Sequence, residues 1–287
     1  MYANYFLINQ EFLSLFNEQA KDKLSEIAYS AYKKYCAKNT KPLSKAAFLT
    51  STRTRYPIVF FYCPKCKASM IAPMIGGFKA ANGLKFCPHC GEPSIDHRFD
   101  EGIKKVLNLL RISKEVSSGN PHDSKHLNQC ILTTLCSVYE VYLREFYADI
   151  LNAKFVRGEH TLYKKFLKDC KNDFLNPGKT SDRLRKELGV NYKQVVGNDA
   201  YKALTVLSDY RNVIVHNNGI CDDTFISQHP NVERHAQILP SLNSTAALIQ
   251  VVIVSANKMD ELYQNEMREA AVAFATDIAI SHNALIT

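Results

Sequence analysis

Arginine, asparagine and histidine lie within six residues of one another in the segment 211–216, at the end of an apolar stretch. A guanidinium group holds phosphate oxygens through charge-assisted hydrogen bonds. Imidazole is the side chain best suited to exchange a proton near neutral pH. Together these groups can cleave RNA without a metal ion, so Arg211 and His216 are candidate catalytic residues and Asn212 is their polar companion.

The preceding residues have the apolar spacing of a helix that begins at Asn198 or Asp199 and that Gly219 can close. One polar stripe follows this helix, formed by Thr205, Asp209, Asn212 and His216. Arg211 lies about 140° around the helix from His216. We therefore expect the two to converge only at a frayed helix end or in a groove between two copies, which favours a homodimer. The alternative is that this spacing arose by chance.

Two Cys-x-x-Cys pairs form the second candidate site, separated by 20 residues: Cys63, Cys66, Cys87 and Cys90. Four thiolates at this spacing predict a structural Zn²⁺ site, and they leave no open coordination position for catalysis. His89 is expected to be exposed rather than to act as a fifth ligand. The other five cysteines are scattered, a pattern that fits a reducing cytoplasm better than a disulfide framework.

Positive charge is concentrated at one end of the chain. Residues 1–99 carry 14 Lys/Arg against 6 Asp/Glu, whereas residues 100–287 carry 22 of each. This asymmetry suggests a nucleic-acid partner for the N-terminal third, although a merely solvated surface is the alternative. The basic residues near the cysteine pairs are Arg53, Arg55, Lys65, Lys67, Lys79, Lys85 and Arg98. Neither a signal peptide nor a membrane span is apparent, so we expect a cytoplasmic protein.

The elements that position these residues divide the chain into three predicted segments. Residues 1–55 are helical, with helical spacing over 9–38; residues 56–99 form a zinc ribbon; residues 100–287 form a helical domain. The run 251–254 could be a strand, but the length of the apolar pattern around it favours a helix. The predicted fold is mainly α, a helical bundle with a small β zinc-ribbon module near the N-terminus.

The motif Arg211-Asn212-x-x-x-His216 resembles the R-x4-6-H signature of HEPN domains, a family of helical ribonucleases in prokaryotic toxin and antiviral systems. The Asn-Asn-Gly-Ile-Cys-Asp-Asp sequence that follows is similar to the ribonuclease-LS and phage-defence type of this family. The resemblance covers roughly residues 101–270, and it implies that Arg211 and His216 are catalytic. It also implies an acidic residue on an earlier helix, for which Glu140 is the best match; an ordinary salt bridge is the alternative for Glu140.

This resemblance implies a metal-independent endoribonuclease that acts as a homodimer through the Arg211–His216 helix. The 2′-hydroxyl of RNA attacks the adjacent phosphate and leaves a 2′,3′-cyclic phosphate. The implied role is that of a toxin or anti-phage effector of abortive infection, with an antitoxin or defence protein as a possible partner. The alternative is a non-catalytic adaptor of such a system, in which the zinc ribbon binds nucleic acid.

Overall fold

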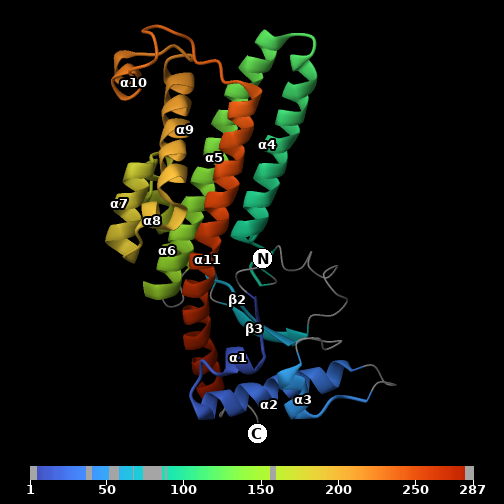
Figure 1. Cartoon of the computed structure of the whole chain (residues 1–287). Coiled ribbons are helices and arrows are strands. Elements are labelled where there is room, and N and C mark those ends of the chain that lie inside the picture. Colours follow the sequence, from blue (N-terminus) through green and yellow to red (C-terminus); the bar gives the residue numbers. More distant parts are fainter. Residues whose placement is uncertain are drawn as a thin grey trace. The chain divides into compact units, whose positions relative to one another are not determined.

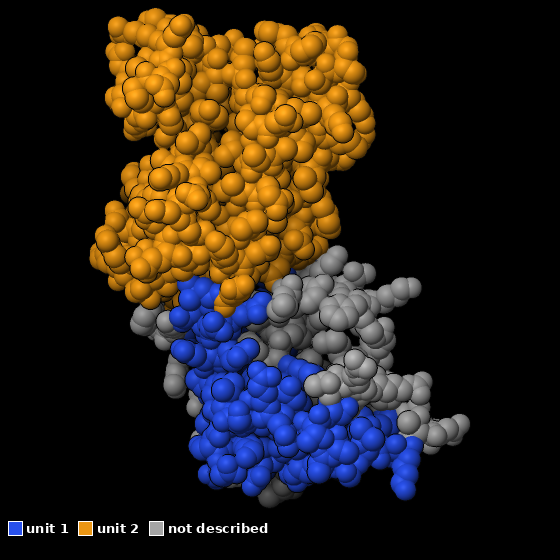
Figure 2. All heavy atoms as spheres, in the orientation of Figure 1, with its two compact units in different colours: residues 1–94, 152–164, 262–287 blue, residues 95–151, 165–261 orange. Residues whose placement is uncertain are grey.

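A computed structural model describes the protein at residues 5–36, 41–51, 58–66, 68–73, 86–87, 89–155 and 160–281. The described chain is mainly helical, as predicted. It divides into two compact units (Figure 2), and each is described by itself. Unit 1 comprises residues 1–94, 152–164 and 262–287, and unit 2 comprises residues 95–151 and 165–261.

Unit 1 contains a small antiparallel sheet in the order β1-β2-β3, built from Tyr5–Leu7, Ile58–Tyr62 and Ser69–Pro73. Its helices are α1 (Gln10–Leu13), α2 (Glu18–Tyr35) and α3 (Lys45–Thr50). The predicted helical stretch over 9–38 is interrupted because the Asn17 side chain accepts from the Ala20 amide and starts a new helix. Apolar side chains of the first two helices and of β2 are buried, among them Leu13, Leu24 and Phe60.

Unit 2 is a helical bundle, as predicted (Figure 1). Helices that lie wholly in unit 2 are α4 (Ile95–Ser117), α7 (Pro177–Leu188), α8 (Tyr192–Val196), α9 (Asn198–His216) and α10 (Asp223–Gln228). Helices α5 (Pro121–Phe155), α6 (His160–Asp169) and α11 (Leu242–Ser281) each contribute residues to both units. One face of α5 is buried, with Ile131, Leu135 and Phe146 at helical spacing along it. Residues 251–254 are helical, which confirms the preference for helix over strand.

The compact units do not follow the three predicted consecutive segments. The predicted boundary at 99/100 falls inside α4, which begins at Ile95. Residues 152–155 of α5 and 262–281 of α11 belong to unit 1, and Met267 and Ala271 of α11 are buried. No helix in the described part of the chain is both long enough and apolar enough to cross a membrane.

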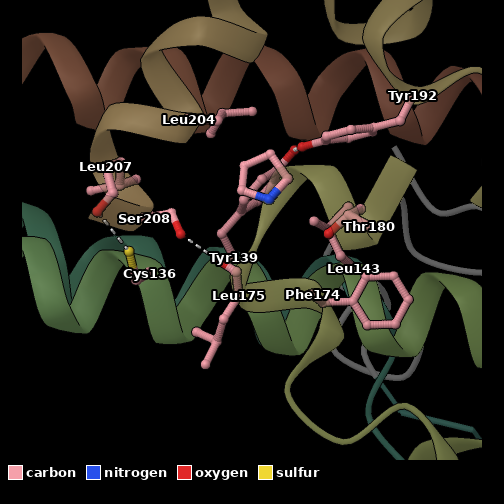
Figure 3. Close-up of a pocket in the computed structure, with 11 residues that line it drawn as sticks. Cys136, Tyr139, Leu143, Phe174, Leu175, Thr180, Tyr192, Leu204, Leu207 and Ser208 are labelled. Atoms are coloured by element: carbon pink, nitrogen blue, oxygen red, sulfur yellow. Dashed lines mark hydrogen bonds between the residues drawn. The ribbon is translucent and has the colours of Figure 1, made fainter. Parts of the chain in front are cut away.

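Helix α9 is anchored by its buried face (Figure 3). The Ser208 hydroxyl donates to the carbonyl of Leu175 at 2.8 Å, and the Cys136 thiol donates to the carbonyl of Leu207 at 3.6 Å. These residues surround a cavity of about 20 Å³, which has room for about one water molecule. Because this face of α9 points inward, the polar stripe on its other side reaches the surface.

Candidate active site and candidate metal centre

The end of α9 is a left-handed turn. Asn218 has φ +52° and Gly219 has φ +79°, and the Gly219 amide donates to the carbonyl of Val213 at 3.0 Å. A Cβ atom at Gly219 would lie 2.8 Å from Nε2 of Gln129, so glycine also allows a close approach to α5. Gly219 thus helps to close the helix, as predicted, and His216 occupies the last turn.

Arg211 and His216 converge on this single helix. Nη1 of Arg211 lies 3.2 Å from Nε2 of His216 and donates to Oδ1 of Asn212 at 3.2 Å. His216 is the last residue of α9, so the two side chains meet at the end of the helix, one of the two places expected, and the long arginine side chain spans the angle between them. Guanidinium has only donors, so Nε2 of His216 is the acceptor in this contact.

An open groove of about 410 Å³ runs beside this end of α9. Four of its lining residues come from α9: Asp209, Asn212, Val213 and His216. The other lining residues are Asn176, Asn217, Asp222, Thr224, Phe225 and Gln228. The groove is within the size range of small-molecule sites, about 300–1,000 Å³. A substrate group in it can therefore reach both the amide of Asn212 and the imidazole of His216.

Glu140 lies on α5 and is partly buried. Burial raises the pKa of its carboxyl group, and the positive charges of Arg144 and Arg211 lower it by a smaller amount. Arg211 also acts on the buried thiol of Cys136, whose pKa burial raises to about 12. The structure therefore places Glu140 within the electrostatic reach of Arg211, and Arg144 is a neighbouring charge that the sequence prediction missed.

A second histidine is also linked to the groove. Nε2 of His229, just after α10, lies 3.0 Å from Oδ2 of Asp209. The His229 ring is stacked on Phe225 with ring centroids 4.3 Å apart. Asp209 was predicted on the polar stripe, but His229 was not singled out, since nothing in the sequence signals that a residue 20 positions further on returns to the helix.

The four predicted zinc ligands come together in unit 1. Cys63 follows β2, and the Sγ atoms of Cys63 and Cys90 are 4.0 Å apart, while those of Cys66 and Cys87 are 3.7 Å apart. All four sulfur atoms lie within 4.8 Å of one another. His89 is exposed, as expected. The four cysteines can hold a metal ion.

Sulfur spacing provides a test of which species fits. Zinc–sulfur bonds of about 2.3 Å at tetrahedral angles put neighbouring sulfurs about 3.8 Å apart. The observed spacings match this value and are far longer than a disulfide bond. Burial raises the pKa of Cys90 to about 11 and raises that of Cys87, but amide donors from Cys90 and His89 lower the pKa of Cys87 overall. The arrangement is compatible with structural zinc.

Two of the basic residues near the cysteines lie in the described part of the chain. Lys65 is buried and its ammonium donates to the carbonyl of Pro93 at 3.0 Å, so its charge is used within unit 1. Arg98 belongs to unit 2, where it pairs with Glu145. The remaining members lie outside the described residues: Arg53, Arg55, Lys67, Lys79 and Lys85.

The chain is thus a mainly helical protein with a four-cysteine cluster in one unit and an arginine–histidine pair beside a groove in the other. Comparison with protein-family models, with curated proteins and with solved structures finds no match to it.

Proposed function

We propose that the protein is a metal-independent endoribonuclease of the HEPN type and that Arg211, Asn212 and His216 form its active site. The observation that supports this most is the 3.2 Å contact between Arg211 and His216 beside the open groove. A guanidinium and an imidazole at this separation can act on one phosphodiester.

In the proposed reaction, the 2′-oxygen of the substrate attacks phosphorus and the bond to the 5′-oxygen breaks. The guanidinium of Arg211 leaves His216 and stabilises negative charge on the phosphoryl oxygens. His216 then carries a proton on Nε2 and gives it to the departing 5′-oxygen. Asn212 orients Arg211 through the hydrogen bond between their side chains, and Glu140 balances its charge. The products are a 2′,3′-cyclic phosphate and a 5′-hydroxyl.

We propose that two copies associate through the end of α9. Val215 and Ile220 support this, since they are large apolar residues with exposed fractions of 49% and 44% beside the site. A two-fold axis there would bring two active sites together. In the cytoplasm such a nuclease would serve as a toxin or anti-phage effector, arresting growth by cleaving RNA, with an antitoxin or defence protein as its regulator.

For unit 1 we propose a zinc ribbon that holds one structural Zn²⁺ through Cys63, Cys66, Cys87 and Cys90. The sulfur spacing and the short strands β2 and β3 support it. A second candidate function follows from the groove, whose carboxylates Asp209 and Asp222 disfavour a phosphate backbone. In that case the protein is a non-catalytic adaptor that binds nucleic acid through the ribbon.

The experiment that decides between these functions is incubation of purified protein with total cellular RNA in EDTA. Wild type is expected to cleave, leaving cyclic-phosphate ends. Arg211→Ala and His216→Ala should each lower the rate by about 10²–10³-fold, because each removes one catalytic group. Arg185→Ala and His122→Ala serve as matched controls, since both residues are exposed and neither lines the groove. Cleavage that survives both site substitutions would remove this site from the proposal.

A further inference from the structure

RNA transesterification needs two proton transfers. One group must accept the proton of the 2′-hydroxyl, and another must give a proton to the 5′-oxygen. His216 supplies only the second in the proposed function, on which this inference rests. The first falls to a second group, and the groove offers two carboxylates for it, Asp209 and Asp222.

We propose that Asp209, held by His229, is the catalytic base that accepts the proton of the 2′-hydroxyl. Asp209 and His216 both line the groove. The second carboxylate of the groove, Asp222, is already engaged, because its Oδ1 accepts from the Phe225 amide at 2.8 Å and its Oδ2 accepts from the Asn217 side chain at 2.5 Å. Asp209 is the other carboxylate of the groove, and its Oδ1 does not cap a helix.

Helix geometry places the two residues on one face of α9. Asp209 and His216 are seven residues apart, which is about two helical turns, so their backbone positions lie about 20° apart around the helix and about 10.5 Å apart along its axis. Asn212 lies between them on the same stripe, and all three residues line the groove. A phosphodiester in the groove can therefore meet a carboxylate on one side and an imidazole on the other.

The surroundings of Asp209 fix its orientation. His229 donates from Nε2 to Oδ2 at 3.0 Å, and the two side chains are only 21% and 14% exposed. Stacking of the His229 ring on Phe225 prevents the imidazole from swinging away. The other polar residues that line the groove are Asn176, Asn212, His216, Asn217, Asp222, Thr224 and Gln228. The contact with His229 uses Oδ2 of Asp209, so we assign proton acceptance to Oδ1.

The step is balanced within one protomer. The 2′-hydroxyl proton moves to Oδ1 of Asp209 while the bond from the 2′-oxygen to phosphorus forms. The bond from phosphorus to the 5′-oxygen breaks, and that oxygen takes the proton from Nε2 of His216. The protein ends with a protonated Asp209 and a neutral His216, and exchange with water restores both.

A substrate with sulfur in place of the bridging 5′-oxygen separates the two roles, because a thiolate leaves without needing a proton. On ordinary RNA, Asp209→Asn and His216→Ala should each lower the single-turnover rate by about 10²-fold. On the sulfur substrate, His216→Ala should regain the wild-type single-turnover rate, whereas Asp209→Asn should remain slow. The matched control is Asp199→Asn, an exposed carboxylate at the other end of α9.

Two further measurements test whether Asp209 has a merely structural role: binding of an uncleavable 2′-deoxy substrate and thermal unfolding. Asp209→Asn should change neither the affinity for that substrate nor the melting temperature. If that variant does not fold, His229→Gln decides, with a tenfold lower rate on both substrates expected. Wild-type rates in the Asp209 variant, or recovery of that variant by sulfur, would overturn the assignment. If wild type cleaves neither substrate, the proposed function itself fails and this inference fails with it.

Discussion

The four-cysteine cluster and the end of α9 hold their functional groups in opposite ways. In the cluster, Cys63 and Cys87 are buried, and amides of His89 and Cys90 donate to the Cys87 sulfur at 3.4 Å. Short turns fix every ligand. At the end of α9, Asn212 and His216 are exposed and are contacted by Arg211 of the same helix, while Asp209 is held by His229, 20 residues further along the chain.

The cluster is therefore expected to contribute mainly to stability, and the end of α9 mainly to reactivity. Metal binding to a four-thiolate site contributes to folding outright, so the cluster is expected to stabilise unit 1. Exposed side chains such as His216 add little to stability, and their replacement is expected to change reactivity alone. Substitutions in the two regions should therefore produce different kinds of loss.

The largest effect is expected from Cys87→Ser. Loss of one thiolate should abolish metal binding and unfold unit 1, because structural zinc contributes about 10–16 kcal/mol in small zinc modules. Metal analysis of reduced protein should find about one zinc per wild-type chain and none in the variant. Circular dichroism should show the accompanying loss of structure. Cys130→Ser is the matched control, since Cys130 is exposed and lies outside the cluster. Full zinc content in the Cys87 variant would contradict the proposed four-cysteine zinc site and its role in stability.

A smaller effect is expected from Val215→Glu. Two copies joined at the end of α9 would bring the introduced carboxylates near the two-fold axis, where like charges repel. We expect the dimer dissociation constant to rise by about 10²-fold, measured by analytical ultracentrifugation, with an unchanged melting temperature. Leu107→Glu provides a control, since Leu107 on α4 is equally exposed at 45%. A wild-type protein that stays monomeric at micromolar concentration would contradict the proposed dimer.

The cluster could be predicted from the sequence because its geometry is local. The Cys-x-x-Cys spacing alone placed four residues in one cage, and the structure brings all four together. The groups of the proposed active site could be predicted only in part. The angular spacing of residues around a helix predicted the polar stripe of α9. It did not predict the contact of Arg211 with His216, because angular spacing takes no account of side-chain length. It gave no sign of His229, since the position of that residue depends on how the chain returns after Gly219.

The unit boundaries show the same limit. Composition changes near residue 99, and this suggested a boundary there. The structure instead starts α4 at Ile95 and shares α5 and α11 between the units. Local pattern predicts where helices lie, but which helices pack in one body depends on contacts between distant residues.

The smallest effect is expected from Glu140→Gln, which tests whether a charged group near Arg211 contributes to the stability of the fold. Burial raises the pKa of this carboxyl group, so the folded state binds its proton more tightly than the unfolded state does. The wild-type carboxylate therefore lowers stability at neutral pH, and this cost disappears as the pH falls through the raised folded pKa toward the ordinary value of 4.5. The glutamine variant should melt slightly higher at pH 7 and at the same temperature as wild type below that value.

Activity should change in the opposite direction. Removing the negative charge near Arg211 should lower cleavage by about tenfold, because the guanidinium loses part of what positions it. Glu115→Gln is the control, an exposed carboxylate that pairs with Arg111 on its own helix. A variant that is more stable yet less active would place Glu140 in the machinery of the site. A variant with lower stability and full activity would instead assign Glu140 to an ordinary salt bridge, and the proposed contrast between the two regions would no longer extend to α5.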